Sequence, residues 1–240
     1  MCRLTLLSCA ASGGFRARRE PSGGGWTGPL ADVTASDCHW TDEYRGAKRK
    51  FAGWATMRGT EARSEATPRM LSTIALFASS RRHGNTGAVL NKIAAELRFG
   101  VVDLCECNVT PYDYAHANRA DGFEPLICKI LEHEQIVFAA PVYWYSVPPQ
   151  MKTFIDRLTD LLELPDLREK GRQLRAKRAF VVATSGVDAI APAFISMFRD
   201  TFAYLGIQYC GHLHVNCDGG YKDGTGERDI KAFESLLRGQ

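Results

Sequence analysis

Residues 79–86 have the sequence SSRRHGNT, which combines small hydrogen-bonding side chains with two arginines and one glycine. Serine, threonine and asparagine donate hydrogen bonds, arginine adds positive charge, and glycine lets the backbone approach a ligand closely. An apolar run precedes this loop and a helical pattern follows it, so the helix N–H groups and positive dipole end face the loop. The loop is therefore predicted to bind an anion. The candidate ligands are Ser79, Ser80, Arg81 or Arg82, Gly84, Asn85 and Thr86.

The spacing within this loop excludes two common nucleotide sites. The triphosphate pattern G-x-x-x-x-G-K-[ST] is missing because no lysine follows Gly84, and the dinucleotide pattern G-x-G-x-x-G is missing too. A monophosphate fits the loop better. The alternative is that Asn85 or Thr86 only caps the helix, and one glycine-containing loop does not decide between the two interpretations.

Two further loops carry residue types that suit a flat ligand. The segment 141–146, PVYWYS, places three adjacent aromatic residues directly after an apolar strand, where their rings can stack on a ring system. Taken alone, such a run is more often packing or a contact between subunits. Residues 184–186, TSG, add small donors and a flexible backbone after another strand.

Ten regular elements are predicted to position these loops. Strands are expected at residues 71–78, 99–106, 135–140, 178–184 and 208–215. Helices are expected at residues 86–98, 124–134, 148–164, 191–205 and around 226–238. Strands that alternate with helices of this length predict βαβ units and a parallel sheet covered on both faces. We therefore predict an α/β fold, a three-layer α/β/α sandwich that binds its ligand beyond the carboxyl ends of the strands.

In this order, SSRRHGNT, PVYWYSVPPQMKTFIDR and ATSG resemble motifs of the flavodoxin-like NAD(P)H-dependent FMN reductases and quinone oxidoreductases, over residues 70 to about 225. The resemblance implies a flavodoxin-like, five-stranded parallel sheet in the order 2-1-3-4-5. It implies that the FMN phosphate is held by Ser79, Arg81, Gly84, Asn85 and Thr86. It also implies that the flavin ring lies against Pro141, Val142, Tyr143, Trp144, Tyr145 and Ser146, with Thr184, Ser185 and Gly186 at its other edge.

The activity that this resemblance implies is transfer of a hydride from NADPH or NADH through FMN to a quinone, a flavin or a similar small acceptor. The cofactor performs this chemistry, so no catalytic residue is assigned. The main alternative is an electron-carrier flavodoxin without nicotinamide turnover, and a third is an FMN-binding regulatory protein. Residues 1–69 hold 11 of the 30 basic and 7 of the 27 acidic residues, which leaves 19 basic and 20 acidic. Flavodoxins are usually strongly acidic, so this balance favours the reductase.

Residues 1–69 are rich in glycine, arginine and serine and show no periodicity, whereas the regular pattern starts at Met70. We predict a disordered N-terminal extension followed by one FMN-binding domain over residues 70–240. Trp26, Trp40 and Trp54 are unusual in a solvated tail, which leaves open a small accessory structure or a start at Met70.

Other features of the sequence bear on location and partners. No run approaches 18 apolar residues, so no membrane span is expected, and scattered cysteines indicate a reducing cytoplasm. The nearly neutral charge after residue 69 predicts no nucleic-acid surface. No metal site is expected at His212 and His214, and residues 109–125 lack the cysteines that hold a cluster in the related iron–sulfur flavoproteins. The family resemblance implies a homodimer.

Overall fold

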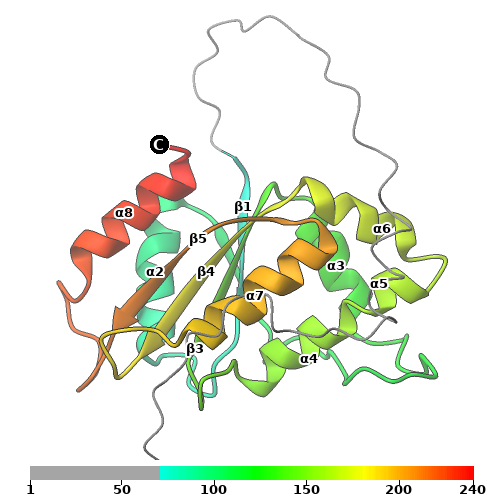
Figure 1. Cartoon of the computed structure of the whole chain (residues 1–240), viewed down its shortest axis with the longest axis horizontal. Helices are drawn as coiled ribbons and strands as arrows, with labels where there is room; N and C mark the ends of the chain where they lie inside the picture. Colours follow the sequence, from blue (N-terminus) through cyan, green and yellow to red (C-terminus); the bar gives the residue numbers. More distant parts are fainter. Residues whose placement is uncertain (1–70) are drawn as a thin grey trace, which may run out of the picture. The chain divides into compact units, whose positions relative to one another are not determined.

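The computed structural model of the chain describes residues 71–240, and the predicted extension over residues 1–69 lies outside them. The described residues form a sheet of five parallel strands in the order β2-β1-β3-β4-β5 (Figure 1). The strands are β1 (Thr73–Phe77), β2 (Gly100–Asp103), β3 (Gln135–Pro141), β4 (Arg178–Ser185) and β5 (Gln208–Asn216). The predicted strand order and sheet direction are therefore confirmed.

Helices cover both faces of the sheet, which gives the predicted three layers (Figure 1). They are α2 (Asn85–Leu97), α3 (Phe123–Leu131), α4 (Pro149–Arg157), α5 (Asp160–Glu163), α6 (Arg168–Gln173), α7 (Pro192–Leu205) and α8 (Glu227–Arg238). One apolar core contains buried residues of α3, α4 and α7, and the other contains buried residues of α2 and α8. Each face of the sheet thus has its own core.

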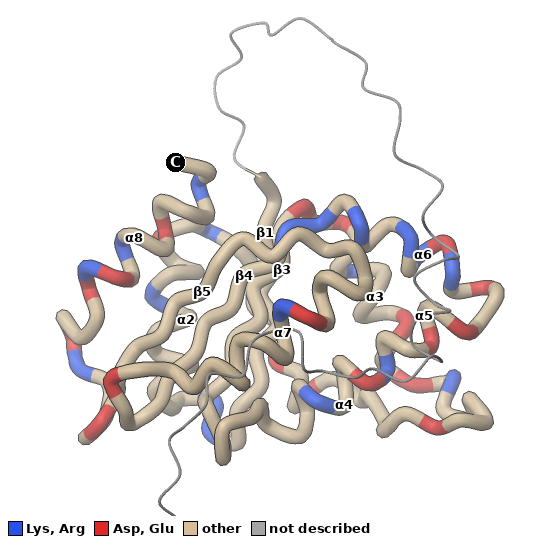
Figure 2. The backbone as a smooth tube through the Cα atoms, in the orientation of Figure 1, with Lys and Arg blue, Asp and Glu red and all other residues tan. Residues whose placement is uncertain are grey.

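The central strands are apolar because both of their faces are covered. All five residues of β1 and all seven of β3 are uncharged, and charged residues cluster on helices and loops instead (Figure 2). The edge strand β5 alternates, with Leu213 and Val215 buried and His212 and His214 on the opposite face. This arrangement is typical of a parallel sheet with one partly solvated edge.

The predicted helix over residues 148–164 is wrong in one respect, because the structure divides it into α4 and α5. The apolar spacing of Met151, Phe154, Leu158 and Leu161 suits a continuous helix, and all four side chains are buried. At the division, however, the N–H of Leu158 bonds to the carbonyl of Ile155, three residues back, so the turn is tighter than in an α-helix. These four side chains are buried whether or not the helix is divided. The apolar periodicity therefore could not reveal the division between α4 and α5.

Two smaller differences concern the ends of elements. The strand predicted over residues 99–106 ends at Asp103, because the Asp103 carboxylate and carbonyl accept the N–H groups of Cys105 and Glu106 in a turn. The short helix α6 was not predicted, and its six residues bury no side chain. Within residues 71–240, no helix has the length and apolar content that crossing a membrane requires.

Candidate functional site

The loop after β1 has the form that an anion site requires. Ser79 is buried at the end of the strand, and its Oγ accepts the N–H of Arg81 at 3.2 Å. The N–H of Gly84 then bonds to the carbonyl of Arg81 at 3.0 Å, which turns the chain into α2. Gly84 occupies the N-cap position and provides no side-chain cap, so the alternative that Asn85 or Thr86 is the cap is wrong. The first N–H groups of the helix are left for another acceptor.

Donors of this loop converge on one oxygen atom. The side chains of Ser79 and Ser80 and the backbone of Ser80 lie close enough to the phenol oxygen of Tyr143 to favour its ionised form as hydrogen-bonding groups. Burial acts to raise the pKa of Tyr143, but these hydrogen bonds and the positive charge of Arg81 lower it below its ordinary value of 10. The loop therefore stabilises negative charge at that point, where the phenol oxygen stands in for an oxygen of an anionic ligand.

Two arginines stand side by side in this loop, and only one is paired. Arg82 forms ion pairs with Glu106 and Asp103, so its charge is already used within the chain. Arg81 is exposed and forms no ion pair with any residue that the structure describes. The sequence left the choice between Arg81 and Arg82 open, and the geometry favours Arg81 as the residue with charge to offer a ligand.

Asn85 and Thr86 connect the loop to its neighbours rather than point away from them. The Asn85 amide accepts the N–H of Tyr221 at 3.0 Å and donates to the carbonyl of Cys217 at 3.4 Å, both in the segment after β5. Thr86 Oγ1 lies 2.6 Å from Thr184 Oγ1, and both side chains are buried. These contacts join the loop after β1 to the end of β4 and to the segment after β5.

Gly87, in the first turn of α2, is a residue that the sequence interpretation missed. A Cβ atom added there would lie 2.1 Å from the carbonyl oxygen of Arg82, a separation that no side chain tolerates. The position therefore keeps the loop close to the helix start. The available signal was an isolated glycine inside a helical pattern, which usually has a packing reason.

Residues 143–146 form a tight hairpin. The N–H of Tyr143 bonds to the carbonyl of Ser146 at 2.8 Å, and the N–H of Ser146 bonds back at 3.0 Å. The two central residues, Trp144 and Tyr145, both have positive φ, 49° and 64°, and their side chains are 93% and 70% exposed. Turns of this kind favour asparagine and glycine, and bulky residues in this conformation cost about 1–2 kcal/mol each. Such strain is found preferentially at functional sites.

The loop after β4 lies at the same end of the sheet, beyond the carboxyl ends of the strands. The N–H of Val142 donates to the carbonyl of Thr184 at 2.9 Å, so residues 141 and 142 stay paired with β4 to its end. Ser185 Oγ lies 2.7 Å from Nε2 of His214, a contact that the sequence interpretation missed. Gly186 is exposed, and a Cβ added there would meet only Asp218 Oδ1, at 4.0 Å, so no steric need for glycine exists at that position.

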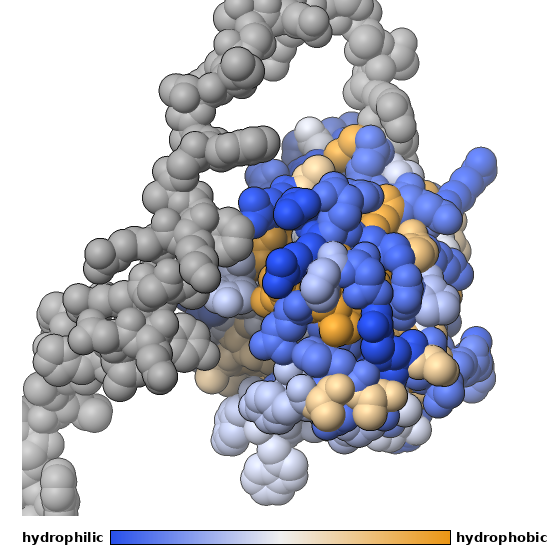
Figure 3. All heavy atoms as spheres, turned by 90° about the vertical axis from the view of Figure 1, so that its right-hand side faces the viewer, coloured by the Kyte–Doolittle hydropathy of each residue, from blue (hydrophilic) through white to orange (hydrophobic). Residues whose placement is uncertain are grey.

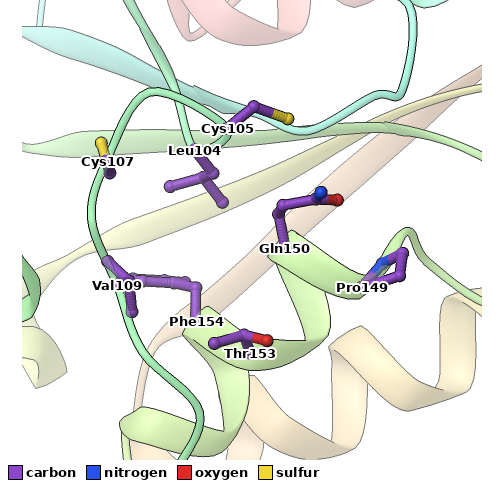
Figure 4. Close-up of a pocket in the computed structure, with 8 residues that line it drawn as sticks. All are labelled: Leu104, Cys105, Cys107, Val109, Pro149, Gln150, Thr153 and Phe154. Atoms are coloured by element: carbon purple, nitrogen blue, oxygen red, sulfur yellow. The ribbon is translucent and has the colours of Figure 1, made fainter. Parts of the chain in front are cut away.

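A separate cavity of about 280 Å³ opens between the segment after β2 and the start of α4 (Figure 4). Cys105 connects it to the anion loop, because its Sγ donates to the carbonyl of Ser79 at 3.4 Å. Gln150 Oε1 is buried and has no hydrogen-bond partner within residues 71–240. Pockets for drug-sized ligands measure about 300–1,000 Å³, so this cavity is small for a three-ring ligand. Its lining residues are Leu104, Cys105, Cys107, Val109, Pro149, Gln150, Thr153 and Phe154, and none of them was predicted.

Comparison with known proteins assigns the family. The family profile described as NADPH-dependent FMN reductase matches residues 71–222, nearly the whole described chain. The chain belongs to this family. The resemblance seen in the three loop motifs is thus confirmed, and the comparisons support the oxidoreductase interpretation over the electron carrier.

Individual relatives agree with this assignment. A Bacillus subtilis (strain 168) protein named as an NAD(P)H-dependent FMN-containing oxidoreductase, YwqN, is 26% identical over 66% of this chain and 91% of its own length. The FMN-dependent NADH:quinone oxidoreductase of Shewanella denitrificans is 26% identical over 48% of this chain and 61% of its own length. The chain therefore spans most of the first relative and less than two thirds of the second.

Solved structures support the fold alone. The Trp repressor binding protein from Bacillus subtilis superposes with a TM-score of 0.53 at 22% identity, over 68% of this chain and 96% of that one. An oxidoreductase from Corynebacterium diphtheriae gives a TM-score of 0.51 at 15% identity, over 71% and 97% of the two chains. Among residues 71–240, no three or more His, Cys, Asp or Glu residues are grouped as metal ligands would be.

Proposed function

We propose that this protein is an FMN-dependent NAD(P)H oxidoreductase that passes a hydride from NADPH or NADH to a quinone, a flavin or a similar small acceptor. Membership of the FMN reductase family supports this function. The observation of the structure that carries it is the loop after β1, where α2 begins at Gly84 without a side-chain cap and the donors of Ser79 and Ser80 lower the pKa of the nearby Tyr143. A loop whose donors favour negative charge on a neighbouring oxygen fits the terminal phosphate of FMN.

The residues fit this cofactor in distinct ways. Ser79 and Ser80 would donate hydroxyl and N–H groups to the phosphate, and Arg81 would add charge beside the start of α2. The Asn85 side chain is committed to the segment after β5, so we assign Asn85 and Thr86 to holding the loops together, with their backbone at the helix N-terminus. This assignment refines the roles that the family resemblance implied.

The ring would lie at the edge between the hairpin and the end of β4. Residues 141–146 and 184–186 are joined there by the bond from Val142 to Thr184, and they present aromatic and small polar groups. When bound, FMN supplies the hydride chemistry. The chain orients the cofactor, and Trp144 and Tyr145 are exposed enough to cover a bound ring. For the phosphate to bind, the Tyr143 hydroxyl must share its donors with the ligand or release them.

Cofactor identity provides the first test of this function. Protein freed of flavin should bind FMN tightly and FAD weakly, because no dinucleotide fingerprint exists to hold a pyrophosphate. Anaerobic addition of NADPH or NADH to the FMN form should then bleach the visible absorbance of the flavin. Bleaching by a reduced carrier protein but by neither nucleotide would instead support the electron-carrier function.

The assembly and location of the protein remain predictions. We expect a homodimer in the reducing cytoplasm with a small-molecule acceptor and no nucleic-acid partner. Light scattering of the FMN form measures the mass of the assembly. A retardation assay with duplex DNA tests whether the protein binds nucleic acid.

A further inference from the structure

The loop that closes the proposed flavin site is linked to a histidine behind it. Ser185 is the last residue of β4, directly after Thr184, whose hydroxyl bonds to Thr86 at the anion loop. Ser185 Oγ accepts the N–H of Val187 at 3.3 Å and lies 2.7 Å from Nε2 of His214 on β5. The hydroxyl hydrogen of Ser185 has two acceptors within reach, the carbonyl of Val187 at 3.4 Å and His214 Nε2, and it can turn between them or toward the site.

His214 belongs to a row of polar groups along the edge strand. His212 and His214 lie on one face of β5, opposite the buried Leu213 and Val215. His212 Nδ1 lies 2.8 Å from the hydroxyl of Tyr209. Because β5 is the last strand of the sheet (Figure 1), this row runs along an edge, from Tyr209 near the amino end of the strand to His214 beside Ser185.

The surroundings keep His214 uncharged at neutral pH. Burial lowers the pKa of His214, and the neighbouring His212 lowers it further. Within residues 71–240, no carboxylate pairs with His214: Asp188, in the loop after β4, is bonded to Asn216, and Asp200 of α7 is paired with Arg199. Arg199 also lies near Tyr209. A neutral imidazole without a fixed counter-ion can accept a proton and pass it on.

The chemistry of the proposed reaction requires such a group. A nicotinamide nucleotide, a quinone and one proton give the oxidised nucleotide and a hydroquinone, so each turnover consumes a proton in addition to the hydride. Ser185 is placed at the proposed ring edge and is only half-buried, and His214 stands behind it.

We infer that Ser185 and His214 form the proton path of this reaction, an inference that rests on the proposed function. His214 takes a proton from water, and its Nε2–H passes that proton to Ser185 Oγ as the Ser185 hydroxyl proton moves to the reduced acceptor. The Oγ–H bond of Ser185 breaks toward the acceptor and re-forms from Nε2, which leaves His214 neutral for the next turnover. His214 is thus a positioning residue that acts through Ser185.

The test compares three variants of the FMN-loaded protein. His214→Gln retains a hydrogen-bonding amide but cannot titrate, Ser185→Ala removes the hydroxyl, and His212→Gln is the matched control on the same face of β5. Positioned acid–base groups contribute about 10²–10⁴-fold to rates, and we expect kcat for quinone reduction to fall at least tenfold in the first two variants and less than twofold in the control. FMN content should stay unchanged in His214→Gln and His212→Gln, whose side chains lie outside the set proposed to hold the cofactor.

Two further measurements separate a proton path from a structural contact. In the wild type, kcat should rise as the pH falls through the lowered pKa of His214, and this rise should disappear in His214→Gln. Nuclear magnetic resonance should show the His214 imidazole pKa moving when FMN binds and when Ser185 is replaced. An unchanged pH profile in His214→Gln, or an equal loss in His212→Gln, would overturn the inference. If neither NADPH nor NADH bleaches the flavin of the wild type, the proposed function is rejected instead.

Discussion

Arg157 and Arg81 belong to two polar clusters that differ in how their hydrogen bonds are used. Arg157, in α4, is 3% exposed, and its guanidinium donates to Asp160 at 2.7 Å, to Asp121, to the carbonyl of Thr110 at 3.0 Å and to that of Asn118 at 3.1 Å. Arg81 is exposed and has no ion-pair partner among the described residues. The first arginine has every partner within the chain, whereas the second leaves its charge available.

This difference separates structural charge from ligand-binding charge. The Arg157 cluster fastens the segment before α3 to α4 and α5. The right-hand side of the molecule in Figure 1 is mostly hydrophilic with scattered apolar patches (Figure 3). The loop after β1 instead directs several donors at a single phenol oxygen. A buried charge with complete partners holds a fold together. An anionic ligand binds where a loop offers more hydrogen-bond donors than the chain has acceptors to pair with them.

The largest effect is expected from breaking the Arg157 cluster. Arg157→Met leaves Asp121 and Asp160 buried without their partner, which should lower the free energy of unfolding by about 3–5 kcal/mol. The matched control is Lys152→Met in the same helix, whose exposed pair with Asp156 should contribute less than about 1 kcal/mol. Urea denaturation measures both. Similar losses in the two variants would show that burial of the pair does not decide its contribution.

Acid should weaken the same cluster. Burial opposes ionisation of Asp121, but hydrogen bonds from Arg157, Thr110 and Phe123 outweigh it and hold its pKa at about 2, below the ordinary 3.8. A carboxylate with a lowered pKa stabilises the fold above its unfolded pKa, and this contribution is lost as the pH falls from about 4 to about 2. The loss should amount to roughly 2 kcal/mol. In Asp121→Asn the stability curve should be flatter over this range, and an unchanged curve would assign the acid sensitivity to other groups.

The sequence predicted the strands and the three loops, because both follow from local patterns. Apolar runs identified β1, β3 and β4 within a few residues, and the residue types of 79–86 predicted a loop that can bind an anion. The pairing of Arg157 with Asp121 could not be predicted, since the two residues lie 36 positions apart and no periodicity connects them. The choice between Arg81 and Arg82 likewise depended on Glu106, which only the fold brings to Arg82. Long-range pairing decided both cases.

The two loop arginines provide the third prediction. Arg81→Met should leave the stability within about 0.5 kcal/mol of the wild type, as expected for an exposed residue. It should weaken FMN binding by about 1.5–3 kcal/mol, roughly tenfold to a hundredfold, because a hydrogen bond to a charged group is lost. Arg82→Met is the adjacent control, and its pairing with Glu106 predicts a much smaller change in affinity. Titration of the flavin-free proteins with FMN measures the two affinities. A larger loss of affinity in Arg82→Met than in Arg81→Met would place the phosphate beside Arg82 instead.

The smallest effect concerns the strained hairpin, which should be stabilised by a change that impairs the site. Tyr145 has φ of 64°, and glycine adopts this conformation without strain, so Tyr145→Gly should raise the free energy of unfolding by about 0.5–1 kcal/mol after the entropy that glycine adds to the unfolded chain. Arg98, at the end of α2, has φ of 56° and lies outside the proposed site, so Arg98→Gly should give a similar gain.

The two variants should then differ in function. Arg98→Gly should leave FMN affinity and turnover unchanged, whereas Tyr145→Gly should weaken them because an exposed aromatic ring is lost from the edge where the flavin is proposed to bind. Thermal unfolding without FMN measures the stability of each variant, and the shift in melting temperature on adding FMN reports its FMN affinity. If Tyr145→Gly is more stable and equally active, the strain at residue 145 serves no ligand. The positive φ would then belong to the turn alone, and the case for the hairpin as a ring support would rest on Tyr143 and Trp144.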